Sequence, residues 1–198
     1  MTRQEAYQIL TKYLTNKNLI KHCLATEATM KALYKRLTPK DAYDPSVEEK
    51  WGITGLLHDA DYELAKGQPE VHGLLLFDPN LAGAKPLENP IEEDIAYAIR
   101  AHNYQNTKVM PKSPMDWAIT SCDQLTGLIV AAALVHPDKK LASISLEFIL
   151  NKFNEKSFAK GADRGSILLC SEKLGMSLSE FIEITLKAMQ SISGDLAL

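Results

Sequence analysis

The segment after residue 113 most constrains how this chain can fold. It opens with Ser113-Pro114 and Asp116, a capping side chain followed by proline at the first helical position, which is typical of a helix start. Apolar or small side chains then recur at helical spacing at Ile119, Cys122, Thr126, Ile129 and Ala133. The run from Leu128 to Val135 also has strand propensity, but it continues this stripe and contains three alanines. The sequence therefore predicts one long, buried helix over residues 114–135.

Similar signals mark helices along the rest of the chain. Ser46 with Glu49, and Ser177 with Glu180, have the spacing of capping boxes. Helices are predicted near residues 2–16, 18–37, 47–60, 68–77, 90–104, 114–135, 141–153, 163–174 and 178–192. A chain of 198 residues can bury roughly 70% of its unfolded surface. We therefore expect residues 1–198 to form a single all-α domain.

Charge and composition limit the kinds of partner that the chain is expected to bind and indicate its expected location in the cell. The chain has 22 Lys and Arg against 25 Asp and Glu, with no basic block of the kind that follows a phosphate backbone, so we expect no long nucleic acid as a partner. The N-terminus carries charges through its first turns, and the longest apolar run is much shorter than the ~20 residues that cross a bilayer. These features predict a cytoplasmic protein with no membrane partner. Cys23, Cys122 and Cys170 are predicted to be buried thiols.

The dipeptide His58-Asp59 ends an otherwise apolar helical stretch, residues 52–57. A buried imidazole and carboxylate are costly unless they are paired or coordinate a metal. His22 and Asp123 lie in the middle of two other predicted helices, also among apolar or small residues. Helical proteins build metal sites from side chains that converge in the core of the bundle. We therefore expect these four side chains to bind a divalent metal ion.

In this order the four residues resemble the HD-domain superfamily of metal-dependent phosphohydrolases. The signature of that superfamily is a histidine, then His-Asp, then an aspartate on separate helices, and the resemblance spans about positions 20–130. It implies a helical bundle of the HD type, with a metal-binding core over about residues 18–136 and C-terminal helices, residues 141–192, packed on it. It also implies that Asp59 and His58 are the catalytic residues.

Two further histidines lie between the His-Asp pair and Asp123. Some members of the superfamily hold two ions, and the resemblance then implies that Asp59 bridges them while His72 and His102 complete the second position. Such members often carry a double histidine at the later place, whereas Asn103 follows here. A neutral amide is a poor transition-metal ligand, so Asn103 is expected to donate a hydrogen bond to substrate or water. The ligand set suits Mn, Fe, Co, Ni, Zn or Mg, and leaves open whether one or two ions bind.

The resemblance implies a hydrolase that uses metal-activated water on a small phosphorylated substrate, either a phosphomonoester, a phosphodiester or a nucleotide. Lys108 and Lys112 follow His102 closely and are the candidates for binding the phosphate, with a solvated surface charge as the alternative for each. Asp61 is expected to orient a ligand histidine, as metal sites generally require, or simply to end its helix. Arg164, at the start of a predicted helix, is expected to be a solvated surface charge, with a substrate contact as the alternative.

Two other functions stay open at this point. Some HD-fold enzymes use nearly the same six ligands as a diiron oxygenase, and a binding or regulatory protein could keep the fold without turnover. Oxygen uptake and phosphate release, measured in parallel, distinguish the two enzymes. The C-terminal helices carry amphipathic stripes, which we expect either to close the bundle or to support a homodimer.

Overall fold

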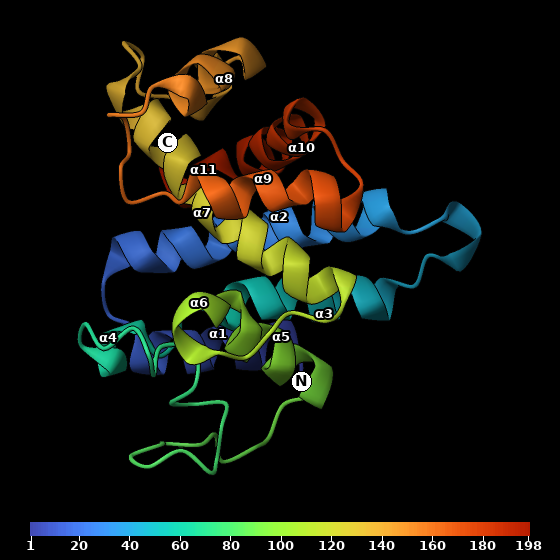
Figure 1. Ribbon diagram of the computed structural model, residues 1–198, viewed down its shortest axis with the longest axis vertical. Coiled ribbons are helices and arrows are strands. Elements are labelled where there is room, and N and C mark those ends of the chain that lie inside the picture. The colour runs from blue at the N-terminus through green and yellow to red at the C-terminus, as the bar shows by residue number, and fades with distance from the viewer.

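The computed structural model describes residues 1–198 and contains helices but no strands, which confirms the predicted all-α class (Figure 1). The helices are α1 (Arg3–Tyr13), α2 (Lys17–Leu37), α3 (Pro45–Leu57), α4 (Tyr62–Ala65), α5 (Glu93–His102), α6 (Tyr104–Thr107), α7 (Pro114–Val135), α8 (Leu146–Asn154), α9 (Arg164–Leu174), α10 (Leu178–Ser191) and α11 (Ser193–Leu196), with short 3-10 turns at Lys40–Ala42 and Leu141–Ser143. In Figure 1, α7 crosses the centre, with α8 and α10 above it and α1, α3 and α5 below.

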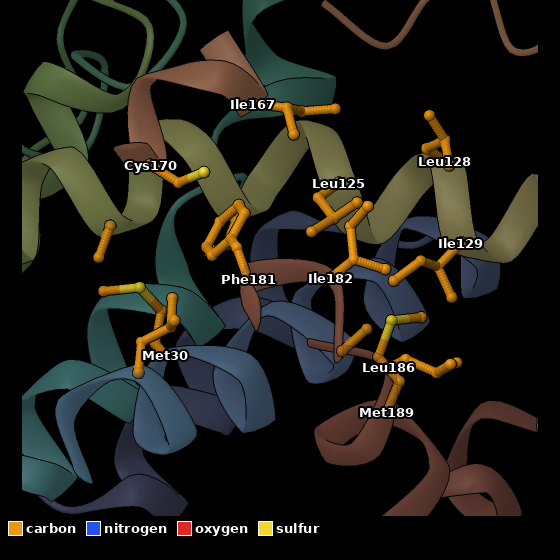
Figure 2. Packing of buried hydrophobic residues seen from close by; sticks show 14 of the residues in the cluster. Met30, Leu125, Leu128, Ile129, Ile167, Cys170, Phe181, Ile182, Leu186 and Met189 are labelled. Atoms are coloured by element: carbon orange, nitrogen blue, oxygen red, sulfur yellow. The ribbon is translucent and has the colours of Figure 1, made fainter. Parts of the chain in front are cut away.

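The long predicted helix is the central helix α7. Its start is a capping box: the Ser113 hydroxyl accepts the N–H of Asp116 at 3.2 Å, and the Asp116 carboxylate accepts the N–H of Ser113 at 3.0 Å. Leu125 and Leu128 share a buried cluster with Phe181 of α10 (Figure 2). One 18-residue window of α7 has a mean hydropathy of 1.6, enough for a membrane span by length and composition alone, and 61% of that window is buried in the fold. Packing thus accounts for the apolar composition of α7.

Several helix starts differ from the predicted ones by a few residues. α3 begins at Pro45, because Asp44 is the N-cap and accepts the N–H of Ser46 at 2.8 Å. Ser46 therefore lies inside the first turn and does not cap it. Ser177 caps α10 as predicted, accepting the N–H of Glu180 at 3.2 Å. The three cysteines are buried and free, as predicted.

The helix predicted over residues 68–77 is wrong, because this segment forms a series of turns. Gly67 and Gly73 have positive φ values of 78° and 87°, which a right-handed helix does not accommodate. The carboxylate of Asp61 accepts the backbone N–H groups of Gly73 and Leu75 at 2.9 Å, so these donors are not available to a helical ladder. The turns place His72 beside the end of α5.

Helices α2 and α3 approach each other closely at Gly55. A Cβ atom added there would lie 2.7 Å from the carbonyl oxygen of Thr26 and 2.8 Å from the backbone nitrogen of Glu27. Both neighbours are main-chain atoms of α2, so neither can rotate away. Glycine at this position therefore sets the separation of the two helices, and it brings His58, three residues later, against His22.

Substituting Gly55→Ala is expected to lower the free energy of unfolding by about 1–3 kcal/mol, because the added methyl group forces the backbones of α2 and α3 apart. Metal binding should weaken as well, since His58 moves with α3. The matched control is Gly127→Ala on α7, where an added Cβ meets no atom within 4 Å. This control should be neutral or more stable by up to ~1 kcal/mol. Urea denaturation checks both, and equal stability of the two variants would contradict the assigned role of Gly55.

Candidate metal centre

The six side chains predicted as ligands meet between α2, α3, α5 and α7. They are supplied as follows: His22 by α2, His58 and Asp59 by the end of α3, His72 by the turns before α5, His102 by the last position of α5, and Asp123 by α7. Residues as far apart in sequence as His22 and Asp123, which are 101 positions apart, are in direct contact. The fold therefore brings all six together.

His22, His58 and Asp59 form a first group, whose ligand atoms lie within 4.8 Å of one another. Nε2 of His22 is 3.1 Å from Nε2 of His58 and 3.5 Å from Oδ2 of Asp59. Asp123 adds its Oδ1 atom, 2.9 Å from Nε2 of His22 and 3.5 Å from Nε2 of His58. Two imidazoles and two carboxylates thus face one another, a donor set that suits divalent transition metals.

Asp59, His72 and His102 form a second group, also within 4.8 Å. Nε2 of His72 is 3.0 Å from Oδ1 of Asp59 and 3.2 Å from Nε2 of His102. Nε2 of His102 is 3.8 Å from the same carboxylate oxygen. Asp59 therefore belongs to both groups, with Oδ2 near His22 and Oδ1 near His72. A carboxylate shared in this way can bridge two ions.

Backbone carbonyls fix the outer nitrogens of two of the imidazoles. Nδ1 of His58 lies 2.8 Å from the carbonyl oxygen of Gly55, and Nδ1 of His102 lies 2.5 Å from that of Ile99. A carbonyl oxygen can only accept, so Nδ1 of each ring carries a hydrogen and donates it. Nε2 of each ring is therefore the nitrogen directed into the cluster. Such outer bonds are the usual means of fixing ligand histidines.

Side-chain oxygens fix the outer nitrogens of the other two imidazoles, those of His22 and His72. Nδ1 of His22 is 3.2 Å from Oγ1 of Thr126, whose hydroxyl donates to the carbonyl of Asp123, so the threonine oxygen accepts from the ring. Nδ1 of His72 donates to the carboxylate of Asp61 at 2.9 Å. Asp61 thus stands where it was expected, beside a predicted ligand. All four histidines direct Nε2 inward and bond Nδ1 outward.

The two close Nε2 pairs fit a cation. They are His22 with His58 at 3.1 Å and His72 with His102 at 3.2 Å. When the hydrogen of each neutral ring is held at Nδ1, the two Nε2 atoms of a pair present lone pairs to each other. Lone pairs at this separation repel unless a proton or a metal cation lies between them. The donor set therefore matches a metal ion in both its chemistry and its orientation.

The charges inside the cluster depend strongly on one another. Burial lowers the pKa of His58, but the charges of Asp59 and Asp123 and the hydrogen bonds with Asp123 and the Gly55 carbonyl together outweigh it and raise that pKa to about 9. Burial is likewise outweighed at His72, where hydrogen bonds to Asp59 and Asp61 raise the pKa to about 10. At His102, burial and the neighbouring positive rings lower the pKa to about 4. The pKa of Asp59 lies well below its usual range despite burial, chiefly because of His58.

Several clefts border the cluster, and two of them lie beside its more exposed histidines. One, of about 340 Å³, is lined by His22 and Asp123, and the other, of about 290 Å³, by His72 and Asn103. The side chains of His22 and His72 are 17% and 13% exposed, whereas that of His58 is fully buried. Each group therefore presents one histidine to solvent, which is where a substrate would approach.

The two lysines expected to bind phosphate lie away from both clefts. Lys108 is in the left-handed conformation at the end of α6, and its ammonium donates to the carbonyl of Gln105 at 2.6 Å. The ammonium of Lys112 sits 4.4 Å from the centre of the Tyr97 ring. Neither lysine lines the His22 cleft or the His72 cleft. Local contacts with their own segments hold both ammonium groups elsewhere in this structure, and phosphate binding by these lysines stays a prediction.

Asn103 lines the His72 cleft, but its carboxamide is already engaged. Nδ2 donates to the carbonyl of Pro69 at 2.6 Å and to that of His72 at 3.3 Å. Its oxygen accepts from the side chain of Asn106 at 2.7 Å. The residue therefore holds the turn that carries His72, and its hydrogen bond to substrate or water stays a prediction.

Sequence reasoning missed two residues that hold the ligands. Thr126 was counted as part of the apolar stripe of α7, although a hydroxyl three residues after Asp123 is a signal for a partner on the same helix face. Gln124 donates to Oδ2 of Asp123 at 2.7 Å. No feature of the sequence distinguishes Gln124 from a solvated helix residue.

In comparisons with protein-family models, curated proteins and solved structures, nothing matches this chain. A function for the chain therefore has to be argued from the geometry of the six ligand side chains and of the two clefts beside them.

Proposed function

We propose that this chain is a metal-dependent phosphohydrolase of the HD type, acting on a small phosphorylated molecule. The observation that carries the proposal is the sharing of Asp59 between two ligand groups, each with two inward-directed Nε2 atoms. The order of the ligands along the chain is the order of the HD signature. Two neighbouring cations fit hydrolysis of a phosphate ester, in which an attacking and a leaving oxygen must both be stabilised.

The residues divide into two sets of ligands. His22, His58, Asp59 and Asp123 would hold one ion, and Asp59, His72 and His102 would hold the second. When bound, such ions lower the pKa of water toward ~7 and neutralise charge on phosphoryl oxygens. Asp61 and Thr126 keep two imidazoles oriented, and the low pKa of Asp59 keeps the shared ligand ionised.

A diiron oxygenase is the second candidate. The six predicted ligands fit it as well: Asn103 turns its carboxamide to the carbonyls of Pro69 and His72 and adds no seventh ligand. Oxygenases of the HD superfamily use a set of nearly that kind. Both candidates require the same side chains, so the choice between them depends on the reaction and not on the ligands.

The deciding experiment loads metal-free protein with iron under anaerobic conditions. Oxygen uptake and phosphate release are then followed in parallel on a panel of phosphomonoesters, phosphodiesters and nucleotides. Asp59→Asn serves as the inactive variant and Asp138→Asn, at an exposed position, as its control. Release of phosphate that depends on Asp59 supports the hydrolase. Oxygen uptake without phosphate release overturns it in favour of the oxygenase, and metal binding with neither reaction favours a regulatory protein.

Metal affinity is expected to increase with pH until about pH 10. The pKa values of His58 and His72 are raised to about 9 and about 10, so both rings carry an extra proton at pH 7 in metal-free protein. A ligand imidazole must be neutral, and binding therefore releases these protons. Calorimetry with Zn²⁺ at pH 7, in two buffers of different ionisation enthalpy, should give about two protons released per protein. A proton count near zero would contradict the assignment of these two ligands.

A further inference from the structure

Arg164 does not behave as the surface charge expected from the sequence. It is only partly exposed, and it directly follows residues 158–163, the second part of the loop that connects α8 to α9 (Figure 1). Its guanidinium donates to the carbonyl oxygens of Phe158 at 2.6 Å, Ala159 at 2.6 Å and Ala162 at 2.8 Å. One side chain therefore fixes three peptide planes of this loop.

These bonds determine where the N–H groups of the loop point. In a trans peptide the N–H is antiparallel to the C=O of the same unit, and the chain has no cis peptide bond. The N–H groups of Ala159 and Lys160 therefore point away from Arg164, and neither has an acceptor within the protein. The third plane carries the N–H of Asp163, which donates to Oε1 of Gln124 at 3.0 Å. Gln124 in turn donates to Asp123, so this part of the loop lies beside the candidate metal centre.

The loop forms one wall of the His22 cleft. Ala159, Gly161 and Ala162 line it together with Gly127 and Gln124 of α7 and the two predicted ligands His22 and Asp123. The three loop residues and Gly127 are small, so their side chains leave the backbone open to this space. Gly127 is a helical glycine that packing does not require, since an added Cβ would meet no atom within 4 Å. An interior helical glycine is unfavourable by ~1 kcal/mol relative to alanine. Its presence here keeps the cleft open beside the ligands.

The electrostatics of this cleft suit an anion. Consecutive N–H groups next to a residue with positive φ, here Ala159 at 42°, form the concave arrangement that binds anions. The positive charge of Arg164 lies directly behind them. The adjoining cavity, of about 490 Å³, shares His22 and Gly127 with this cleft and adds Lys21. Donors are thus gathered on the side of the centre that Lys108 and Lys112 do not reach.

We propose that residues 158–163 form the phosphoryl-binding loop of this centre, in which the N–H groups of Ala159 and Lys160 bind oxygens of a phosphate held against His22 and Asp123. Arg164 is a positioning residue that acts through the loop and does not touch the phosphate. The inference rests on the proposed function and adds to it the element that recognises the substrate. It also fixes the direction of approach, from the His22 cleft and not from the His72 cleft.

The test is a titration of ¹⁵N-labelled, zinc-loaded protein with inorganic phosphate, followed through backbone amide shifts. The amide protons of Ala159 and Lys160 should move downfield as they form hydrogen bonds to phosphate. The amide of Asp163, already bonded to Gln124, should move less. The largest shifts at residues 67–73, which border the other cleft, would overturn the proposal, as would unmoved amides at 159 and 160.

The matched variants are Arg164→Lys and Lys156→Gln. Lysine at position 164 keeps the charge but lacks the planar guanidinium that binds three carbonyls, so phosphate affinity should fall about tenfold or more, with zinc content unchanged. Lys156 is exposed in the same connection between α8 and α9 but lies outside residues 158–163, so Lys156→Gln should retain phosphate affinity within about twofold. A purely structural role of Arg164 would change stability without changing phosphate affinity in the folded variant. That result would also overturn the proposal.

The two claims can fail separately. Phosphate ester hydrolysis by a protein whose amides at 159 and 160 ignore phosphate would overturn the loop assignment and leave the hydrolase intact. Amide shifts at these two positions without any hydrolysis would retain the anion-binding loop and overturn the hydrolase.

Discussion

Replacing Asp59 by asparagine is expected to abolish metal binding at both positions, whereas His72→Ala should remove only the second ion. The reason is that Asp59 contacts histidines of both groups, with Oδ2 3.5 Å from Nε2 of His22 and Oδ1 3.0 Å from Nε2 of His72. Asparagine has nearly the same shape but neither the charge nor the second acceptor oxygen. Affinity should fall more than about 100-fold at each position, as expected for loss of an anionic ligand.

Metal analysis of folded, gel-filtered protein measures the effect directly. Asp59→Asn should contain almost no metal, and His72→Ala should contain about half of the wild-type amount. Asp138→Asn, a change of the same kind at an exposed position on the loop after α7, should be unchanged. Equal metal loss in Asp59→Asn and His72→Ala would contradict the bridging role of Asp59.

Replacing Asp61 by asparagine is expected to damage both stability and the second metal position. The buried carboxylate of Asp61 accepts the ring N–H of His72 and the backbone N–H groups of Gly73 and Leu75, all at 2.9 Å. The amide of asparagine can replace only one of the two oxygens as an acceptor, so at least one buried N–H loses its partner. We expect about 1–3 kcal/mol lower stability, and 10–100-fold weaker binding of the second ion.

Urea denaturation of metal-free protein separates the two effects. Asp78→Asn is the matched control, because Asp78 lies in the same turns, accepts a single backbone N–H from Asn80 at 2.9 Å and contacts no ligand. The control should retain both stability within about 1 kcal/mol and full metal content. If Asp61→Asn bound both ions as tightly as the wild type, the turns would not depend on this carboxylate.

Much of the helical scaffold could be predicted because the signals are local. Ser113-Pro114 with Asp116 specifies a capping box, and the stripe that follows specifies a buried face, so the bounds of α7 match the prediction. The segment around His72 could not be predicted in the same way. Its conformation depends on Asp61, eleven positions earlier in sequence, and on positive φ at Gly67 and Gly73. The spacing of apolar residues along the sequence gives no information about such contacts.

The residues of the candidate site likewise divide into those that the sequence could predict and those that it could not. The six predicted ligand residues are recognisable because their types and order are unusual for apolar helices. The residues that hold them are not, because Thr126 and Gln124 are ordinary helix residues that gain a role only through their contacts with His22 and Asp123. The contacts of the cationic side chains could not be predicted for a related reason: charge alone does not indicate which way a side chain points. Arg164 was expected at the surface and instead organises a loop beside the centre.

The central claim is that these six side chains form one centre for two ions with Asp59 between them. The most direct test is a crystal structure of manganese-loaded protein with anomalous difference maps calculated from data collected on the two sides of the manganese edge. We predict two peaks, one bounded by His22, His58 and Asp123 and the other by His72 and His102, both in contact with Asp59. A map with no peak among these residues, or with peaks that do not touch Asp59, would contradict the account.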